Sequence, residues 1–158
     1  MSRPSPTTPI KNDEVLWRRV LYGTGQYVLE NGVLRVTATA FMDRKREPSV
    51  DRSLLVEHLH EGGAAFTAQD DNNGVVSLGT ADVRGIAEAR RDKNGNKLET
   101  YVADVDPRPL SPSNLAHCVV VMSPTVTEIP TMYKKLVERL KRLAKWVIPP
   151  LDMRQSDR

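Results

Sequence analysis

The chain has 158 residues, of which 39% are hydrophobic and 27% are charged. These proportions are those of an ordinary globular domain, and they exclude a fully disordered chain and a long coiled coil. The formal net charge is only +3, and the single cysteine, Cys118, excludes an internal disulfide, so we expect a reducing, cytoplasmic environment.

The N-terminal segment is rich in proline, serine and threonine. Because such a segment buries little apolar surface, we expect a disordered arm over residues 1–12. It contains no apolar core of a signal peptide, and no apolar run elsewhere has the length that crosses a bilayer. The sequence therefore predicts a single domain over residues 13–150, a polar tail over residues 151–158, and no membrane partner.

One strand and a hairpin are expected at the start of the domain. Residues 15–22 are rich in β-branched and aromatic side chains, which favour a strand. Residues 26–29 and 33–41 flank Asn31-Gly32, a pair that supplies the positive φ angles of a tight turn. Residues 33–41 also alternate apolar and polar side chains, as a half-buried strand does.

A short helix is expected next, because Leu54, Leu55 and Leu59 follow residues that suit a helix start. Ser49 or Asp51 would serve as its N-cap, since a hydroxyl or carboxylate oxygen can accept from the first free backbone N–H groups.

The middle of the chain predicts strands. Residues 75–78 read as a short strand after a turn cluster, and residues 117–122 read as a central strand. The composition of residues 83–92 also allows a helix, but an Asn-Gly pair separates this segment from the strand-like residues 100–105. We therefore favour a second hairpin there, followed by an irregular, proline-rich connection over residues 106–113.

The C-terminal segment carries an apolar stripe with helical spacing. The helix is expected to start at Pro130 and to stop at Pro149. The residues of the stripe are Met132, Leu136, Leu140, Leu143 and Val147. The predicted fold is thus α+β: a mostly antiparallel sheet of five or six strands, covered on one face by this C-terminal amphipathic helix and by the short helix.

The same helix carries basic residues away from its apolar stripe, and these are candidates for binding a partner or phosphate. They are Lys134, Lys135, Lys141, Arg142 and Lys145. Clustered cations release counterions when they bind a polyanion, which favours a nucleic-acid surface. The alternative is a solvated face of a packed helix, because the segment lacks the interleaved exposed aromatic residues of a single-strand binder.

Arg18 and Arg19 are unusual because they interrupt an otherwise apolar strand. Alternation along a strand sends the two side chains to opposite faces, so one guanidinium must be paired in a partly buried setting. It is either a clamp for a phosphate or carboxylate of a ligand, or half of a structural ion pair with Asp43, Asp51 or Asp104.

His117 stands at the start of the central strand, and an imidazole is the side chain best suited to exchange protons near neutral pH. Together with Arg18 or Arg19 it could serve phosphoryl or glycosyl chemistry, or it could be a hydrogen-bonded histidine at the edge of the core. His58 and His60 lie on different faces of the short helix and make a weak metal pair. With no zinc, dinucleotide or P-loop motif, we expect no metal and no cofactor.

Four short blocks resemble a pattern of small bacterial proteins to which no activity is assigned. Their pattern is Leu-x-Arg-Arg-Val, then Ala-Phe, then Ser-Val-Asp, then Asn-Pro-Ala-His, and the match covers residues 16–121. Leu115 stands where the pattern has proline. The resemblance implies that the blocks meet in one place, so the candidate site residues are Arg18, Arg19, Ser49, Asp51 and His117.

The leading expectation for function is a non-enzymatic accessory protein of a bacterial multi-component system, which binds a larger protein through a sheet edge or the basic helix. A second hypothesis is a small enzyme acting on a phosphate-bearing substrate, a nucleotide or RNA, through Arg18, Arg19 and His117. A third is nucleic-acid binding through the basic helix.

Overall fold

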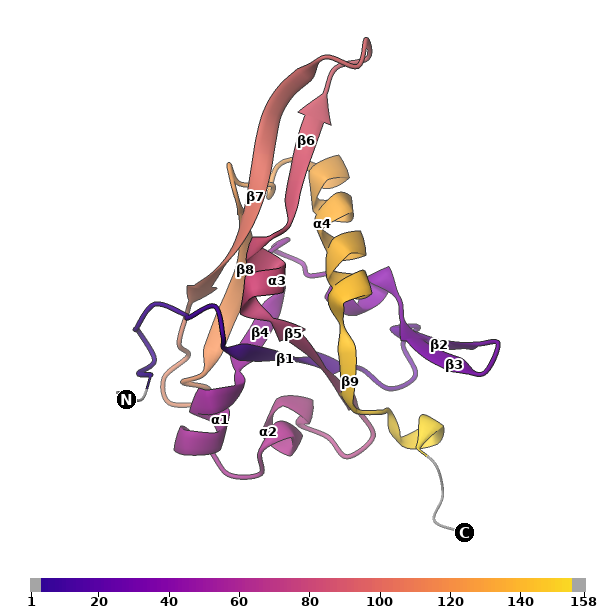
Figure 1. The fold of residues 1–158 in the computed structure, drawn as a ribbon. Helices are drawn as coiled ribbons and strands as arrows, with labels where there is room; N and C mark the ends of the chain where they lie inside the picture. The colour runs from indigo at the N-terminus through magenta and orange to yellow at the C-terminus, as the bar shows by residue number, and fades with distance from the viewer. Residues whose placement is uncertain (1–3, 155–158) are drawn as a thin grey trace.

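The computed structural model describes residues 4–154 and shows an α+β fold (Figure 1). The main sheet contains β1 (Val15–Val20), β4 (Ser49–Arg52), β5 (Gly74–Gly79), β6 (Ala87–Arg91), β7 (Lys97–Pro107), β8 (His117–Ser123) and β9 (Lys145–Ile148). A separate hairpin consists of β2 (Tyr27–Glu30) and β3 (Val33–Val36). The helices are α1 (Ser53–Leu59), α2 (Ala64–Ala68), α3 (Thr80–Arg84) and α4 (Pro130–Leu143), with short 3-10 helices η1 (Ala38–Phe41) and η2 (Leu151–Met153).

The main sheet has the strand order β6-β7-β8-β4-β1-β5-β9, and its neighbouring strands all pair antiparallel. The prediction of an antiparallel α+β fold is confirmed, but the predicted five or six strands are too few. β6 and β7 form the second predicted hairpin, which extends beyond the rest of the sheet in Figure 1. The first hairpin is also confirmed, because Asn31 and Gly32 adopt the positive φ angles, 51° and 77°, that its turn requires.

Two apolar clusters lie on opposite faces of the main sheet, as alternation along β1 requires. Leu16 and Val20 belong to the larger cluster, which includes Leu136 and Leu140 of α4. Trp17 belongs to the smaller cluster, with residues from α1, α2 and β5. We predicted that the short helix and the C-terminal helix cover the same face, and this is wrong: α4 packs on one face, and α1 and α2 pack on the other.

The C-terminal helix ends earlier than predicted, at Leu143 rather than near Pro149. Val147 continues the helical spacing of the apolar stripe, but it lies in β9. This strand pairs with β5, and along it Trp146 and Ile148 are half-buried, whereas Lys145 and Val147 are exposed. The exposure of residues 145–148 therefore alternates as in a strand. This segment forms a strand because the backbone N–H and C=O groups at the edge of β5 need hydrogen-bond partners, which a longer α4 would not provide.

The N-cap predicted for the short helix is also wrong. Ser49 and Asp51 lie within β4, and Arg52 occupies the N-cap position without a capping side-chain bond. The sequence did not predict α2, whose five residues are too few for a periodic pattern, and it did not separate α3 from β6. Of these two short helices, α2 matters for the site, because it lies beside β1.

Residues 4–12, predicted as part of a disordered arm, lie against the domain. Ile10 is buried in the larger cluster, and the backbone carbonyl groups of Ser5 and Thr8 accept hydrogen bonds from Arg52. Residues 1–3 of the predicted arm and residues 155–158 of the predicted tail lie outside the described residues. Across residues 4–154, no helix combines the length and the apolar character needed to cross a membrane.

Candidate functional site

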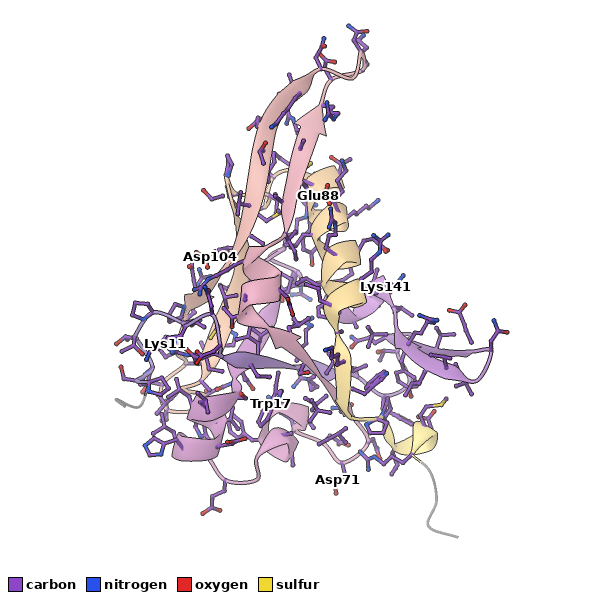
Figure 2. The ribbon with its side chains drawn as sticks, viewed as in Figure 1. Lys11, Trp17, Asp71, Glu88, Asp104 and Lys141 are labelled. Carbon is purple, nitrogen blue, oxygen red and sulfur yellow. The ribbon has the colours of Figure 1, made fainter. Side chains whose placement is uncertain are left out.

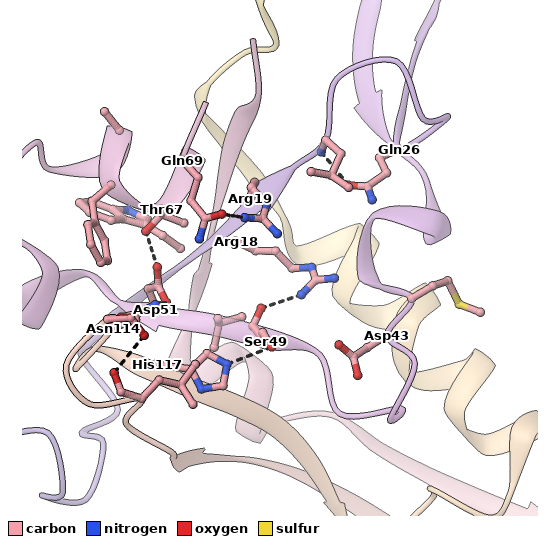
Figure 3. A pocket seen from close by; sticks show the side chains of 18 of the residues that line it. Arg18, Arg19, Gln26, Asp43, Ser49, Asp51, Thr67, Gln69, Asn114 and His117 are labelled. Atoms are coloured by element: carbon pink, nitrogen blue, oxygen red, sulfur yellow. Dashed lines mark hydrogen bonds between the residues drawn. The ribbon is translucent and has the colours of Figure 1, made fainter. Parts of the chain in front are cut away.

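A gap in the main sheet forms the candidate site. β1 pairs with β5 along all of its residues, but it pairs with β4 only at Leu16 and Trp17. Beyond Trp17 no register joins β1 to β4, and a cavity of about 690 Å³ is lined there by residues of both strands (Figure 3). The sheet therefore opens where the next residues of β1 are Arg18 and Arg19.

Arg18 spans this gap. Its Nε donates to the carbonyl oxygen of Ala40 and its Nη1 to the carbonyl oxygen of Ser49, both at 2.6 Å. The guanidinium also lies over the ring of Phe41, with its carbon 5.5 Å from the centroid. Burial lowers the pKa of Arg18 to about 10, and Asp43 partly offsets this effect, so the side chain is still a cation at neutral pH.

Helix α4 fixes the segment that holds Arg18. The hydroxyl of Tyr133 donates to the carbonyl oxygen of Phe41 at 3.0 Å and accepts from the backbone N–H of Asp43 at 2.6 Å. Tyr133 is buried in the larger cluster. The core of the domain thus holds η1, and with it two contacts of Arg18, in place.

The predicted ion pairs of the two arginines do not form. Within residues 4–154 no carboxylate lies within ion-pair distance of Arg18 or Arg19. Arg19 instead donates to the side-chain oxygen of Gln69 at the end of α2. Asp104, one of the predicted partners, pairs with Arg84 at 2.8 Å.

Asp51, another predicted partner, is held by neutral donors. Its Oδ2 accepts from the hydroxyl of Thr67 at 2.7 Å, and its Oδ1 accepts from the amide of Asn114 at 2.8 Å. The side-chain oxygen of Asn114 in turn accepts from the backbone N–H of Ala116 at 3.0 Å. Both oxygens of Asp51 are therefore occupied by neutral donors, and neither arginine forms an ion pair with it.

His117 forms a hydrogen-bonded chain with Ser49. Its Nε2 lies 3.0 Å from Ser49 Oγ, and its Nδ1 lies 2.8 Å from the carbonyl oxygen of Arg108. A carbonyl oxygen can only accept, so Nδ1 carries the hydrogen, and Nε2 of a neutral ring accepts the proton of the Ser49 hydroxyl. The pair forms because β4 and β8 are adjacent, with Asp51 opposite His117 in the register.

The structure brings all five predicted site residues to this one cavity: Arg18, Arg19, Ser49, Asp51 and His117 all line it (Figure 3). Sequence reasoning missed further lining residues, namely Trp17, Gln26, Asp43, Phe66, Thr67, Gln69 and Asn114. Asn114 was inside a block of the bacterial pattern and could have been included. Phe66 and Thr67 could not, because they lie on the unpredicted α2.

The two other histidines do not form a metal site with each other. His60 Nε2 accepts from the backbone N–H of Leu115 at 3.1 Å, and its ring stacks on Phe66 with centroids 4.1 Å apart. No group of three or more possible metal ligands lies together in the part of the chain that the structure describes.

Of the five basic residues predicted to form one helix surface, only some are exposed on α4 without an ion pair to a described residue. Lys134, Lys135 and Arg142 are exposed on α4, without an ion pair to any described residue. Lys141, labelled in Figure 2, lies 3.5 Å from Glu138. Lys145 is exposed on β9 rather than on the helix. The basic surface of α4 is therefore defined here as the three exposed, unpaired cations.

Comparison of the chain with models of protein families, with curated proteins and with solved structures finds no match.

Proposed function

We propose that this protein is a small enzyme that acts on a phosphate-bearing small molecule, such as a nucleotide, in the cavity between β1 and β4. The observation that carries the proposal is the convergence of two arginines and the Ser49–His117 pair on that cavity. This proposal replaces the accessory role as the leading function, because a purely docking protein does not require polar groups gathered in a concave site.

The two arginines supply the site for the anion. Arg18 uses Nε and Nη1 for backbone carbonyl groups, and its Nη2 forms no hydrogen bond to a described residue. Among the described residues, the guanidinium of Arg19 is hydrogen-bonded to the neutral side chain of Gln69 alone. A phosphate group accepts several charge-assisted hydrogen bonds, and a partly buried guanidinium that is already oriented binds it with little loss of side-chain freedom.

The size of the cavity favours a small molecule over an RNA strand. Its volume of about 690 Å³ lies within the range of ordinary ligand pockets. Aromatic side chains of Trp17 and Phe66 line the same cavity and offer apolar surface for a base or another ring. A nucleoside monophosphate is the ligand class that uses both the cations and this surface.

His117 supplies acid and base chemistry beside the anion site. Its Nε2 is hydrogen-bonded to Ser49, and the carbonyl group of Arg108 fixes the ring orientation. A neutral imidazole held in this way accepts a proton at Nε2 and can return it to a leaving oxygen.

Calorimetric titration with inorganic phosphate and with nucleoside monophosphates tests this function. We expect Arg18→Met and Arg19→Met each to weaken binding by roughly 10- to 100-fold, the value of one or two lost charge-assisted hydrogen bonds. Arg35→Met is the matched control, because Arg35 is exposed on β3 and does not line the cavity. Equal affinity for the wild type and both cavity variants would refute the proposal.

The basic surface of α4 supports a second candidate function, binding of nucleic acid. Lys134, Lys135 and Arg142 are exposed and unpaired among the described residues, and α4 packs beside the β6–β7 hairpin, where Arg139 pairs with Glu88 at 2.7 Å (Figure 2). Binding through such a surface weakens steeply as salt increases. The partnership with a larger protein stays a prediction.

Filter binding of duplex DNA and of single-stranded RNA at increasing salt tests the second candidate. A variant with Lys134, Lys135 and Arg142 all changed to Gln should reduce both the affinity and the salt dependence. The control changes Lys11, Lys45 and Lys97, which are also exposed, in the same way. Salt-independent binding, or no binding at low salt, would remove this candidate.

A further inference from the structure

We propose that Ser49 is the nucleophile of the reaction and that it forms a covalent phosphoserine intermediate. This inference rests on the function proposed above and specifies its mechanism. Two observations of geometry support it: Ser49 donates its hydroxyl proton to His117, and Arg18 lies beside Ser49 at the cavity. A third is that other nucleophilic side chains nearby are buried or hydrogen-bonded.

The hydroxyl proton of Ser49 points to the imidazole. Because Nδ1 of His117 donates to the carbonyl oxygen of Arg108 at 2.8 Å, the Nε2 of the neutral ring is left as an acceptor, and Ser49 Oγ is the donor at 3.0 Å. No described residue donates a hydrogen bond to Oγ. Its lone pairs are therefore free to attack a group in the cavity that Ser49 lines. A hydroxyl, a base and a group that orients the base form the usual arrangement of an activated serine.

Arg18 is attached to the same residue as the nucleophile. Its Nη1 is hydrogen-bonded to the backbone carbonyl oxygen of Ser49 at 2.6 Å, so one residue positions both the hydroxyl and the cation. Figure 3 shows both side chains on the gap between β1 and β4. A phosphoryl group bound by Arg18 is thereby brought close to Oγ, and the guanidinium stabilises the charge on the phosphoryl oxygens during transfer.

The step balances without any further reactant except water. Oγ attacks phosphorus, its proton moves to Nε2 of His117, the bond from phosphorus to the leaving oxygen breaks, and His117 returns the proton to that oxygen. Water then attacks the phosphoserine and gives a proton to Nε2, the bond from phosphorus to Oγ breaks, and Oγ recovers the proton. The net reaction is hydrolysis of a phosphate ester.

Three other side chains with nucleophilic atoms, at or near the cavity, are less available than Ser49. The thiol of Cys118 is buried and donates to the carbonyl oxygen of Ala116 at 3.3 Å, and burial raises its pKa to about 12. Both oxygens of Asp51 accept hydrogen bonds. Ser113 lines the same cavity, but its hydroxyl donates to a backbone carbonyl oxygen at 3.4 Å and contacts no imidazole.

Labelling with diisopropyl fluorophosphate tests the nucleophile directly and does not require knowledge of the natural substrate. Ser49 attacks the phosphorus, fluoride leaves, and the proton passes through His117 to solvent. We expect one label per chain, found on the peptide that contains Ser49 and not on the one that contains Ser113. Ser49→Ala should abolish labelling, and His117→Gln should slow it by about 100-fold or more, the usual contribution of a general base.

Hydrolysis of p-nitrophenyl phosphate, followed after an acid quench, separates this inference from the proposed function. Trapping of phosphate on Ser49 during turnover supports the covalent route.

Turnover that persists in a folded Ser49→Ala variant, with no label on the wild type, would overturn the inference. The proposed function would remain, with water as the nucleophile. Labelling of Ser49 without any binding of phosphate compounds would keep the nucleophile and reject the phosphate substrate. Equal labelling of Ser49 and Ser113 would show that Ser49 is not activated.

Discussion

Two arginines on adjacent strands, the buried Arg52 and the partly buried Arg18, have different surroundings. The side chain of Arg52 on β4 is 1% exposed and makes five hydrogen bonds, to Glu14, Ser5 and Thr8. Arg18 on β1 makes two hydrogen bonds, both to backbone carbonyl groups, and has no ion pair within the described residues. Arg52 is thus neutralised within the protein by a direct ion pair, whereas Arg18 lines a cavity and has only the more distant charge of Asp43 to offset its own.

The difference distinguishes a structural charge from a charge kept for a ligand. Burial of a cation is costly, and the fold normally offsets the cost with a carboxylate and a full set of acceptors, as it does for Arg52. At Arg18 the carboxylate of Asp43 acts on the guanidinium without reaching ion-pair distance, and the carboxylate of Asp51 is bound by Thr67 and Asn114. Proteins depart from such rules mainly at functional sites, so the arrangement at Arg18 marks a binding site.

The largest expected effect is the loss of the Arg52 pair. Arg52→Met leaves the buried carboxylate of Glu14 without its cation, which typically costs about 3–5 kcal/mol of folding free energy. Urea denaturation followed by circular dichroism measures the change. The exposed pair of Arg84 and Asp104 provides the control, because Arg84→Met should cost about 1 kcal/mol or less. A small effect of Arg52→Met on the free energy of unfolding would contradict the structural role that we assign to Arg52.

The next effect concerns one of the donors that bind the carboxylate of Asp51. Thr67→Val removes the hydroxyl that donates to Asp51 Oδ2 at 2.7 Å and preserves the shape of the buried side chain. Loss of a hydrogen bond to a buried carboxylate should cost about 1.5–3 kcal/mol. Urea denaturation measures this change also, and Thr125→Val, at an exposed position, is the control. An unchanged free energy of unfolding would show that Asp51 does not depend on Thr67.

Replacement of Arg18 should affect stability less than either change. Arg18→Met removes two hydrogen bonds to backbone carbonyl groups, but it also removes a partly buried cation that forms no ion pair with a described residue, so we expect a loss below about 2 kcal/mol. The same variant should lose most of its affinity for phosphate. A cost as large as that of Arg52→Met would show that Arg18 has a structural role like that of Arg52.

The sequence predicted the members of the site better than their environment. Arg18 and Arg19 stand out as charges in an apolar strand, and His117 stands at the start of one, so local pattern was sufficient to select them. The predicted ion pairs of these arginines did not form, because pairing is decided by contacts between distant segments. Thr67 reaches Asp51 only through α2, a helix too short to predict from periodicity.

The strands were likewise predicted where the signal is local and missed where it depends on distant segments. Hairpin turns with Asn-Gly and apolar runs predicted β2, β3 and β8, since those signals are local. β9 was predicted as helix, because Val147 extends the helical stripe and the partner strand β5 lies about 70 residues earlier in the chain. The buried pair of Glu14 and Arg52 was also missed, since nothing in either local sequence shows that the two side chains meet.

The smallest effect is expected at the exposed pair of Arg84 and Asp104, and it depends on pH. Partial burial raises the pKa of Asp104, but the hydrogen bonds from Arg84 and from the backbone N–H of Val105, both at 2.8 Å, outweigh it, and the net pKa lies below the ordinary value. A carboxyl group whose pKa is lowered by folding stabilises the fold above its unfolded pKa, and this contribution disappears as the pH falls through the folded pKa.

Asp104→Asn should therefore lower the free energy of unfolding by about 0.2–1 kcal/mol at neutral pH, and the difference from the wild type should shrink towards zero in acid. Urea denaturation at a series of pH values measures this, and high salt should reduce the neutral-pH difference because the pair is exposed. Asp106→Asn, two residues along the same exposed face of β7, has no ion pair to a described residue and should leave stability unchanged. If Asp104→Asn lowered the free energy of unfolding as much as Arg52→Met does, burial would not explain the difference between the two ion pairs. The inference that a partly buried cation without an ion pair marks a ligand site would then lose its basis.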